Sequence, residues 1–287
     1  MFTKLQDALK FNSTVKSIII PIVIALVANM GIEMLTSIGI EMVLPTPEGK
    51  MISLGGTIGM FLNIVLSIIL IINVSKIKVK DLGLGLKGVF GKVFIGMITG
   101  LAVLSLVGFS IYSLGGIEIT YSFKPEFMFP ILLGLVFFIL QGTSEELIFR
   151  AYLMTHFSKK MGIPLAVLFS SIFFTLIHAL NPGMVVMAIV NLMVFSVVFS
   201  MVYLISGNLW FTGIFHGLWN FSQGLLWGSL VSGITLQESV FKSTPVAENT
   251  LISGGTFGFE GSIVTTVVGL ILIAILSVMY INKNKKS

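Results

Sequence analysis

The sequence predicts an all-α protein, a polytopic bundle of about eight transmembrane helices whose two termini lie on the cytoplasmic side. Hydrophobic residues make up 55% of the 287 residues and charged residues only 10%, whereas a soluble domain carries about 25% charged residues. The mean hydropathy is +1.05, so the chain lacks the polar surface that a water-soluble fold needs. We therefore expect one integral membrane domain over residues 1–287.

Eight apolar runs are long enough for a spanning helix, which needs about 20 residues. Turn-forming or charged residues separate the runs, for example Pro45-Thr46-Pro47, Lys76-Ile77-Lys78 and Ser206-Gly207-Asn208. The first run is far longer than the apolar part of a secretory signal peptide, so we expect it to be retained. The expected spans cover residues 17–40, 52–74, 91–113, 127–156, 163–180, 183–206, 209–230 and 262–281.

Basic residues predict the orientation, because cytoplasmic loops of membrane proteins are enriched in lysine and arginine. With the N-terminus inside, the inner segments hold 14 of the 17 basic residues and the outer segments hold 3. The net charge of +5 therefore reflects membrane topology, and we expect no nucleic-acid partner. The outer three are Lys50, Lys124 and Lys242, and the inner set comprises Lys4, Lys10, Lys16, Lys76, Lys78, Lys80, Lys87, Lys92, Arg150, Lys159, Lys160, Lys283, Lys285 and Lys286.

The composition also bears on the location of the protein. Cysteine is absent, which excludes disulfides and thiol nucleophiles. A lysine-rich chain without cysteine favours a bacterial origin, so the expected location is the plasma membrane of a bacterium. The outer loop around 231–261 is long and rich in Gly, Ser and Thr, a composition that allows mobility.

The fourth expected span contains the densest group of ionisable residues, Glu145, Glu146 and Arg150. Ionisable residues inside a span are costly and therefore mark a candidate functional site. Glu146 and Arg150 are four residues apart, so they share a helix face and can form an ion pair. Glu145 points about 100° away from that face, free to face a cavity. The same charges could instead cap the cytoplasmic end of a helix.

Two later spans carry further polar residues. Phe174 and His178 lie four residues apart in the fifth span, and His216 and Asn220 have the same spacing in the seventh. Counted at 1.5 Å per residue from the inner turns, Glu145, His178, His216 and Asn220 lie at similar depths. We expect these four side chains to meet in one cavity open to the cytoplasm. The third histidine, His156, is expected at the membrane interface.

These motifs resemble those of the type II CAAX prenyl endopeptidase family, also called the CPBP or Abi family, for CAAX protease and bacteriocin processing. The resemblance is carried by Glu145-Glu146…Arg150, Phe174…His178 and His216…Asn220, over about 140–225. It implies an intramembrane endopeptidase with its catalytic core at about 127–230.

The resemblance also implies a role for each matching residue. Glu145 and His178 would activate water, and His216 and Asn220 would stabilise the oxyanion. Glu146, Arg150 and Phe174 would support the site. Carboxylates can act as general bases in such a cavity, and donors aimed at an oxyanion contribute a few kcal/mol each.

Several alternatives stay open on the sequence alone. The family is often described as metalloprotease-like, and Glu145, His178 and His216 could ligate zinc, but the HExxH motif is absent and we expect no cofactor. The same fold could serve as a non-catalytic membrane protein that binds a bacteriocin and gives self-immunity, or as a small transporter. The expected partners are the lipid bilayer and a peptide or membrane-protein substrate, whose identity and prenylation do not follow from the sequence, nor does the oligomeric state.

Overall fold

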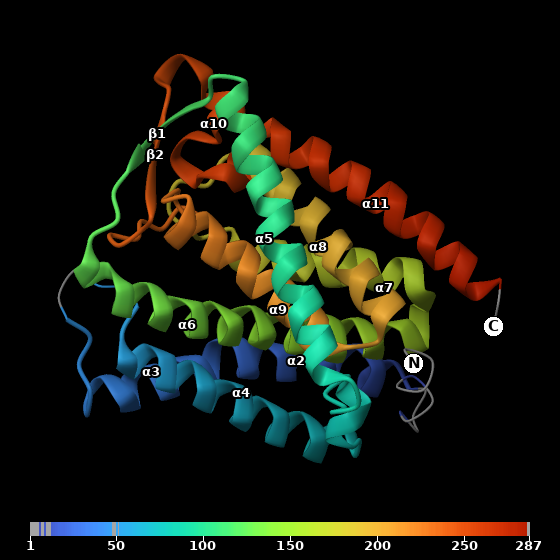
Figure 1. The fold of residues 1–287 in the computed structure, drawn as a ribbon. Coiled ribbons are helices and arrows are strands. Elements are labelled where there is room, and N and C mark those ends of the chain that lie inside the picture. The colour runs from blue at the N-terminus through green and yellow to red at the C-terminus, as the bar shows by residue number, and fades with distance from the viewer. Residues whose placement is uncertain (1–5, 7–8, 10–12, 48–49, 51, 286–287) are drawn as a thin grey trace.

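Long helices packed side by side form the frame of the protein (Figure 1). The computed structural model describes residues 6, 9, 13–47, 50 and 52–285. Lys4, Lys10 and Lys286, which the orientation argument counts, lie outside the described residues. The α-helices are α2 (Ile20–Leu26), α3 (Glu33–Glu41), α4 (Leu54–Ser75), α5 (Val89–Ser113), α6 (Met128–Glu146), α7 (Thr155–His178), α8 (Val186–Ser206), α9 (Leu209–Phe221), α10 (Thr250–Ser253) and α11 (Ile263–Asn284).

Shorter elements extend or connect these helices. Four π-helical segments continue the α-helices, and they are Val15–Ile19, Val27–Ile32, Leu147–Met154 and Ser222–Leu226. Single 3₁₀ turns occur at Val79–Leu82, Pro125–Phe127, Ala247–Asn249, Gly255–Phe257 and Phe259–Gly261. The strands β1 (Ile117–Tyr121) and β2 (Phe241–Pro245) pair antiparallel, with Ile117 opposite Pro245 and Tyr121 opposite Phe241.

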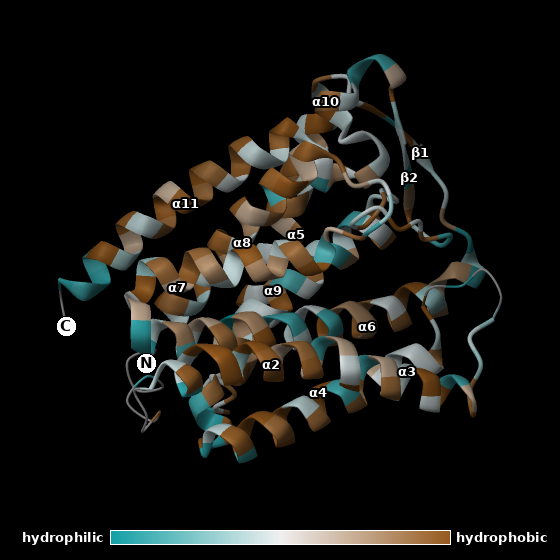
Figure 2. Ribbon diagram, turned by 180° about the vertical axis from the view of Figure 1, so that it is seen from behind, coloured by the Kyte–Doolittle hydropathy of each residue, from teal (hydrophilic) through white to brown (hydrophobic). Residues whose placement is uncertain are grey.

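Six helical stretches in the described part of the chain are long and apolar enough to cross a membrane. Large apolar side chains such as Leu35, Phe94 and Phe109 are more than 60% exposed along them, as expected of a surface that faces lipid rather than water. Figure 2 shows hydrophobic residues along the lengths of the long helices and polar residues at their ends. The protein is therefore an integral membrane protein. The six stretches are Val15–Glu41, Leu54–Ser75, Val89–Ser113, Pro125–His178, Val186–Ser206 and Ile263–Asn284.

The expected number of eight spans is not confirmed, because three of the expected spans differ from the other five. The fourth and fifth merge into the single stretch Pro125–His178, which covers 54 residues. The seventh is represented by α9, which has only 13 residues before it continues into the π-helical segment Ser222–Leu226.

The stretch Pro125–His178 is a hairpin rather than one rod. At Gly162 the backbone leaves the helical region, with φ +78° and ψ 168°. The legs before and after this residue then lie against each other, since Ser170 Oγ donates to Phe149 O at 2.7 Å and the rings of Phe149 and Phe174 are 5.4 Å apart. The turn at Gly162 falls between the expected fourth and fifth spans, 127–156 and 163–180.

The predicted turn between the sixth and seventh expected spans is confirmed at Ser206-Gly207-Asn208, between α8 and α9. Helix α8 ends at Ser206, and Gly207 adopts a left-handed conformation with φ +58°, which glycine permits without a steric cost. Asn208 then caps α9, because its side-chain Oδ1 accepts a hydrogen bond from Phe211 N at 3.0 Å.

Helix α9 is buried almost along its whole length, between α5 and α6 (Figure 1). Its contact with α6 is made through glycines: a Cβ added to Gly217 would lie 2.7 Å from Ile139 Cα, and one added to Gly142 would lie 2.9 Å from Gly213 O. Small residues let two membrane helices approach closely. This contact brings the carboxylates that follow Gly142 next to the histidine that precedes Gly217.

The connecting segments divide between two ends of the bundle. The β1–β2 ribbon lies at one end, and the start of the first helical stretch and the end of α11 lie at the other (Figure 1; Figure 2). We call these the ribbon end and the terminal end. The ribbon end includes 42–47, 50, 52–53, 114–127, 179–185 and 227–262, and bonds such as Asn249 Nδ2 to Gly115 O at 2.9 Å tie its segments together. The terminal end includes 76–88, 159–162 and 207–208, tied by Asn208 Nδ2 to Gly83 O at 3.1 Å.

The segment 227–262 is more structured than its composition suggested. It contributes β2, whose pairing with β1 was not predicted, although the alternating sequence of Ile117–Tyr121 is typical of a strand. Glu260 Oε2 accepts hydrogen bonds from Ser232 N at 2.7 Å, Ser232 Oγ at 2.8 Å and Gln223 Nε2 at 3.2 Å. A single carboxylate therefore joins the two ends of this segment to the helical bundle.

The glycine contact between α6 and α9 gives the first testable prediction. Gly217→Ala should destabilise the protein by about 1–3 kcal/mol, because the added methyl group overlaps the α6 backbone and forces the helices apart. Gly91→Ala is the matched control, since nothing lies within 4 Å of a Cβ at Gly91. Thermal unfolding in detergent measures both, and equal stability of the two variants would contradict the close contact.

Candidate active site

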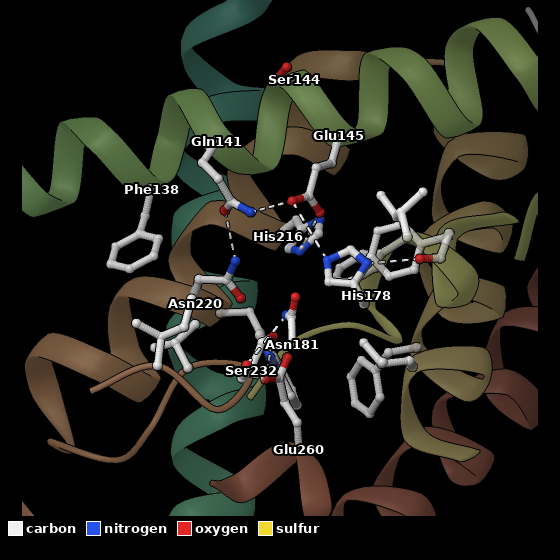
Figure 3. Close-up of a pocket in the computed structure, with 18 of the residues that line it drawn as sticks. Phe138, Gln141, Ser144, Glu145, His178, Asn181, His216, Asn220, Ser232 and Glu260 are labelled. Carbon is white, nitrogen blue, oxygen red and sulfur yellow. Dashed lines mark hydrogen bonds and ion pairs between the residues drawn. The ribbon is translucent and has the colours of Figure 1, made fainter. Parts of the chain in front are cut away.

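A cavity of about 300 Å³ lies between α6, α7, α8, α9 and the segment 227–262. Glu145, His178, His216 and Asn220 all line it, as the depths of these residues along their helices predicted. In Figure 3 the side chain of Glu145 points from α6 towards His178 and His216, and Asn220 lies next to Gln141. The structure therefore brings together the four side chains, from three helices that are distant in sequence.

The carboxylate of Glu145 lies between two imidazole rings. Its Oε1 is 3.9 Å from His178 Nε2, and its Oε2 is 3.7 Å from His216 Nε2. The side chain is 12% exposed, and Oε2 is buried with no hydrogen-bond partner among the described residues. These separations exceed a direct hydrogen bond, so there is room for a small group between the carboxylate and each ring.

Hydrogen bonds on the far side of each ring fix which nitrogen carries the proton. His178 Nδ1 lies 2.8 Å from Phe174 O, and a carbonyl only accepts, so Nδ1 is the donor. His216 Nδ1 lies 3.0 Å from Glu146 Oε1, and the ionised carboxylate likewise accepts. In the neutral rings both Nε2 atoms therefore present a lone pair towards Glu145.

Glu146 and Arg150 form the ion pair that their spacing predicted, at 3.2 Å between Glu146 Oε1 and Arg150 Nη1, with both side chains fully buried. The same oxygen also holds His216, which the spacing did not predict. Glu146 therefore supports the site directly, since it neutralises the arginine and orients one of the two histidines.

Arg150 is held from several sides. Its Nη2 donates to Ser196 Oγ at 3.0 Å, and its guanidinium lies over the ring of Phe174 at 4.5 Å and that of Phe199 at 5.8 Å. The ring of Phe174 is also 4.5 Å from that of His178. Phe174 thus packs between the buried cation and the cavity, a cation–π arrangement that suits a desolvated arginine.

Gln141 is a site residue that the motifs did not indicate. Its Nε2 donates to Glu145 Oε1, and its Oε1 accepts from Asn220 Nδ2 at 2.8 Å (Figure 3). The Glu145 carboxylate only accepts hydrogen bonds, so the NH₂ group of Gln141 must face it. The carbonyl oxygen of Gln141 then faces Asn220, whose NH₂ group must be the donor. Asn220 Oδ1 then remains buried without a partner in the described structure. The spacing of four residues between Gln141 and Glu145 was the signal that could have found it.

The cavity lies towards the ribbon end of the bundle. Asn181, Ser232 and Glu260 line it, and all three belong to segments that the basic residues place outside. We expected these segments outside and the cavity open to the cytoplasm. These two expectations conflict, because a cavity lined by the outer segments lies towards the outer side. With the lysine-rich terminal end in the cytoplasm, the cavity would lie towards the outer side of the membrane, and with the opposite orientation it would lie towards the cytoplasm.

His156 is not part of the site. It is 1% exposed, and its Nε2 bonds to Ser75 Oγ at 3.0 Å while its Nδ1 bonds to Tyr152 O at 2.8 Å. Helix α4 covers this side chain through Ser75, the last residue of the helix. His156 is a packing residue within the bundle.

By the sequence, the residues that could hold a metal ion are Glu145, His178 and His216. Within the residues that the structure describes, no three His, Cys, Asp or Glu side chains are grouped so that they could hold a metal ion. The Glu145 carboxylate oxygens lie 3.9 Å from His178 Nε2 and 3.7 Å from His216 Nε2, and Glu145 Oε1 accepts a hydrogen bond from Gln141. We derive no step through a metal.

The comparison with known families agrees with the motifs. A comparison with curated proteins gave no match. A family model named Rce1-like, and described as type II CAAX prenyl endopeptidase Rce1-like, matches residues 127–222. This segment includes α6 to α9 and all four residues that face one another in the cavity. The resemblance to type II CAAX prenyl endopeptidases is thereby confirmed, over residues 127–222, as a match to the Rce1-like family.

Proposed function

We propose that the protein is an intramembrane endopeptidase of the bacterial plasma membrane, which cleaves membrane-associated peptides or proteins with activated water. The observation that carries the proposal is the position of Glu145, whose carboxylate faces the Nε2 atoms of His178 and His216 at 3.9 and 3.7 Å. The match of residues 127–222 to a protease family supports hydrolysis as the reaction.

The first step is the attack of water on the scissile carbonyl. A water molecule about 2.8 Å from both Glu145 Oε1 and His178 Nε2 spans their 3.9 Å separation. It donates one hydrogen bond to each atom, which leaves an oxygen lone pair directed at the substrate. As the carbon–oxygen bond forms, the proton of the water passes to Glu145, which acts as general base.

The negative charge that develops on the carbonyl oxygen needs hydrogen-bond donors. His216 can donate from Nε2 when its ring is doubly protonated, and Glu146 Oε1 accepts the hydrogen bond from its Nδ1. Asn220 can donate once its Nδ2 leaves Gln141 Oε1. The tetrahedral intermediate then collapses: the carbon–nitrogen bond breaks, and Glu145 returns the proton to the departing amine.

We further propose that eight helical legs cross the membrane, with both termini inside. The two legs of the hairpin Pro125–His178 would cross separately, and α9 with Ser222–Leu226 would form the seventh crossing. The basic residues support this orientation, since the ribbon end carries only Lys50, Lys124 and Lys242. The active cavity would then face the outer side of the membrane.

The peptidase proposal is tested by cleavage of a library of membrane-anchored peptides by the purified protein in nanodiscs. Glu145→Gln and His178→Ala should each lower kcat about 10²- to 10⁴-fold, because each removes one contact to the attacking water. Glu118→Gln, an exposed carboxylate on β1, is the control and should cut as the wild type does. A metal chelator should leave cleavage unchanged, and its loss would overturn the metal-free mechanism.

If the library is cut equally well by wild type and both active-site variants, the proposed mechanism is wrong. If no peptide is cut, but cells that carry Glu145→Gln are protected from a bacteriocin as well as cells with the wild type, the non-catalytic immunity function replaces the peptidase.

Gln141→Met tests the hydrogen-bonded chain from Glu145 to Asn220. The substitution keeps the length of the side chain but removes both bonds, so kcat should fall about 10- to 100-fold with little change in KM. Asn73→Leu is the matched control, since it removes an exposed amide on α4 that bonds only to Ile69 O. A wild-type kcat in Gln141→Met would show that Glu145 and Asn220 need no such support.

The orientation is tested by cysteine labelling, for which the cysteine-free chain needs no prior changes. A membrane-impermeant maleimide added to intact cells should label Thr244→Cys, at the exposed ribbon. It should label Lys160→Cys, at the terminal end, only after the cells are permeabilised. The reverse pattern would place the cavity on the cytoplasmic side.

A further inference from the structure

Glu33 is a carboxylate in the first spanning stretch that the proposed mechanism does not use. It lies eight residues before Glu41, the end of that stretch, which places it about 12 Å inside the membrane-spanning helix. It lines the same cavity as Glu145. No described residue forms a hydrogen bond or an ion pair with its carboxylate. A carboxylate at this depth is costly unless a partner satisfies it.

The fully buried polar atoms that the cavity leaves unpaired are of one kind. Two buried atoms of its lining lack a partner in the described structure, Glu145 Oε2 and Asn220 Oδ1, and both are acceptors. Asn220 is only 4% exposed, and its Oδ1 cannot turn away because its Nδ2 is bonded to Gln141. The Glu33 carboxylate adds a third acceptor. A complementary ligand would supply N–H donors.

The charge of the lining points the same way. The charged residues that line the cavity are Glu33, Glu145 and Glu260, and no lysine or arginine is among the described lining residues. Glu260 is already satisfied by Ser232 and Gln223, and Glu145, which accepts a hydrogen bond from Gln141, is the proposed general base. Glu33 is therefore the carboxylate that is left to pair with a cation from outside the chain.

A second cavity gives Glu33 a connection to the ribbon end. This cavity, of about 220 Å³, shares Glu33, Met60 and Phe137 with the first and extends to Thr46. Its other carboxylate, Glu41, accepts hydrogen bonds from Thr46 N at 2.7 Å and Thr46 Oγ1 at 2.8 Å. Glu33 thus lies where the two cavities meet, between the catalytic groups and the surface.

We propose that Glu33 binds a lysine or arginine side chain of the peptide that the cavity cleaves, while Asn220 Oδ1 accepts a hydrogen bond from a main-chain N–H of the same peptide. This inference rests on the proposed peptidase function and adds a substrate class to it: membrane-associated peptides with a cationic residue near the scissile bond. An ion pair partly withdrawn from water discriminates against a neutral residue, since the half-buried carboxylate of Glu33 would then stay unpaired.

The test measures binding, so that it does not depend on turnover. The probes are six-residue myristoylated alanine peptide amides with one lysine at each successive position, each matched by a peptide with glutamine at that position. The protein is Glu145→Gln in nanodiscs of zwitterionic lipid, which removes the competing carboxylate and avoids attraction of lysine to an anionic membrane. We expect the lysine peptide to bind about tenfold tighter or more at one or two adjacent positions.

Addition of Glu33→Gln should abolish this preference, and addition of Glu118→Gln should preserve it. Equal binding of lysine and glutamine peptides at every position, or a preference that persists without Glu33, would overturn the proposal. Thermal unfolding without peptide checks that the double variant is folded. If it is not, the lysine–glutamine comparison with Glu33 intact still decides the question.

The two proposals fail in distinguishable ways. Cleavage by the wild type without any lysine preference would keep the peptidase and eliminate the cation site. A lysine preference that depends on Glu33, in a protein whose wild type cuts no peptide of the library, would keep the binding site and eliminate the peptidase.

Discussion

The buried carboxylate of Glu146 is the interaction on which the rest of the site depends. It neutralises Arg150, the only arginine in the chain, and it orients His216. An unpaired charge at this depth would cost several kcal/mol, so the arginine, the carboxylate and the imidazole hold one another in place. Arg150 in turn fixes Phe174 through its ring face, and Phe174 packs on His178. The two histidines that face Glu145 are thus positioned through one ion pair.

The glycine contact between α6 and α9 makes that ion pair geometrically possible. Gly142 and Gly217 let the helix backbones meet without intervening side chains, so Glu146 can reach across to His216. The adjacent Glu145, turned about 100° around the helix, faces the cavity instead. Two neighbouring residues of the same type therefore have different surroundings, one dry and paired, the other open to substrate.

Much of this could be predicted from the sequence, because helical periodicity fixes which residues share a face. The Glu146–Arg150 pair, the convergence on one cavity and the break at Ser206-Gly207-Asn208 follow from spacing and turn chemistry alone. Glu260 could not be found in this way, because it reaches the cavity through a segment whose path depends on tertiary contacts. Glu33 lies more than a hundred residues before the motifs, and only the packing of the first helical stretch brings it to the site. The side of the membrane that the cavity faces does not follow from the depth of the catalytic groups, because it depends on which connecting segments line the cavity.

The covering segment 227–262 has a consequence for biosynthesis. The four groups that face one another in the cavity all precede it in the chain, and the helices that carry them are complete at Phe221. A nascent chain can therefore bring its carboxylate and histidines together before the wall that contains Glu260 has left the ribosome. The helices that carry the catalytic groups are synthesised first, and the segment 227–262 follows. A chain that ended before 227 would therefore lack the wall of the cavity that contains Glu260.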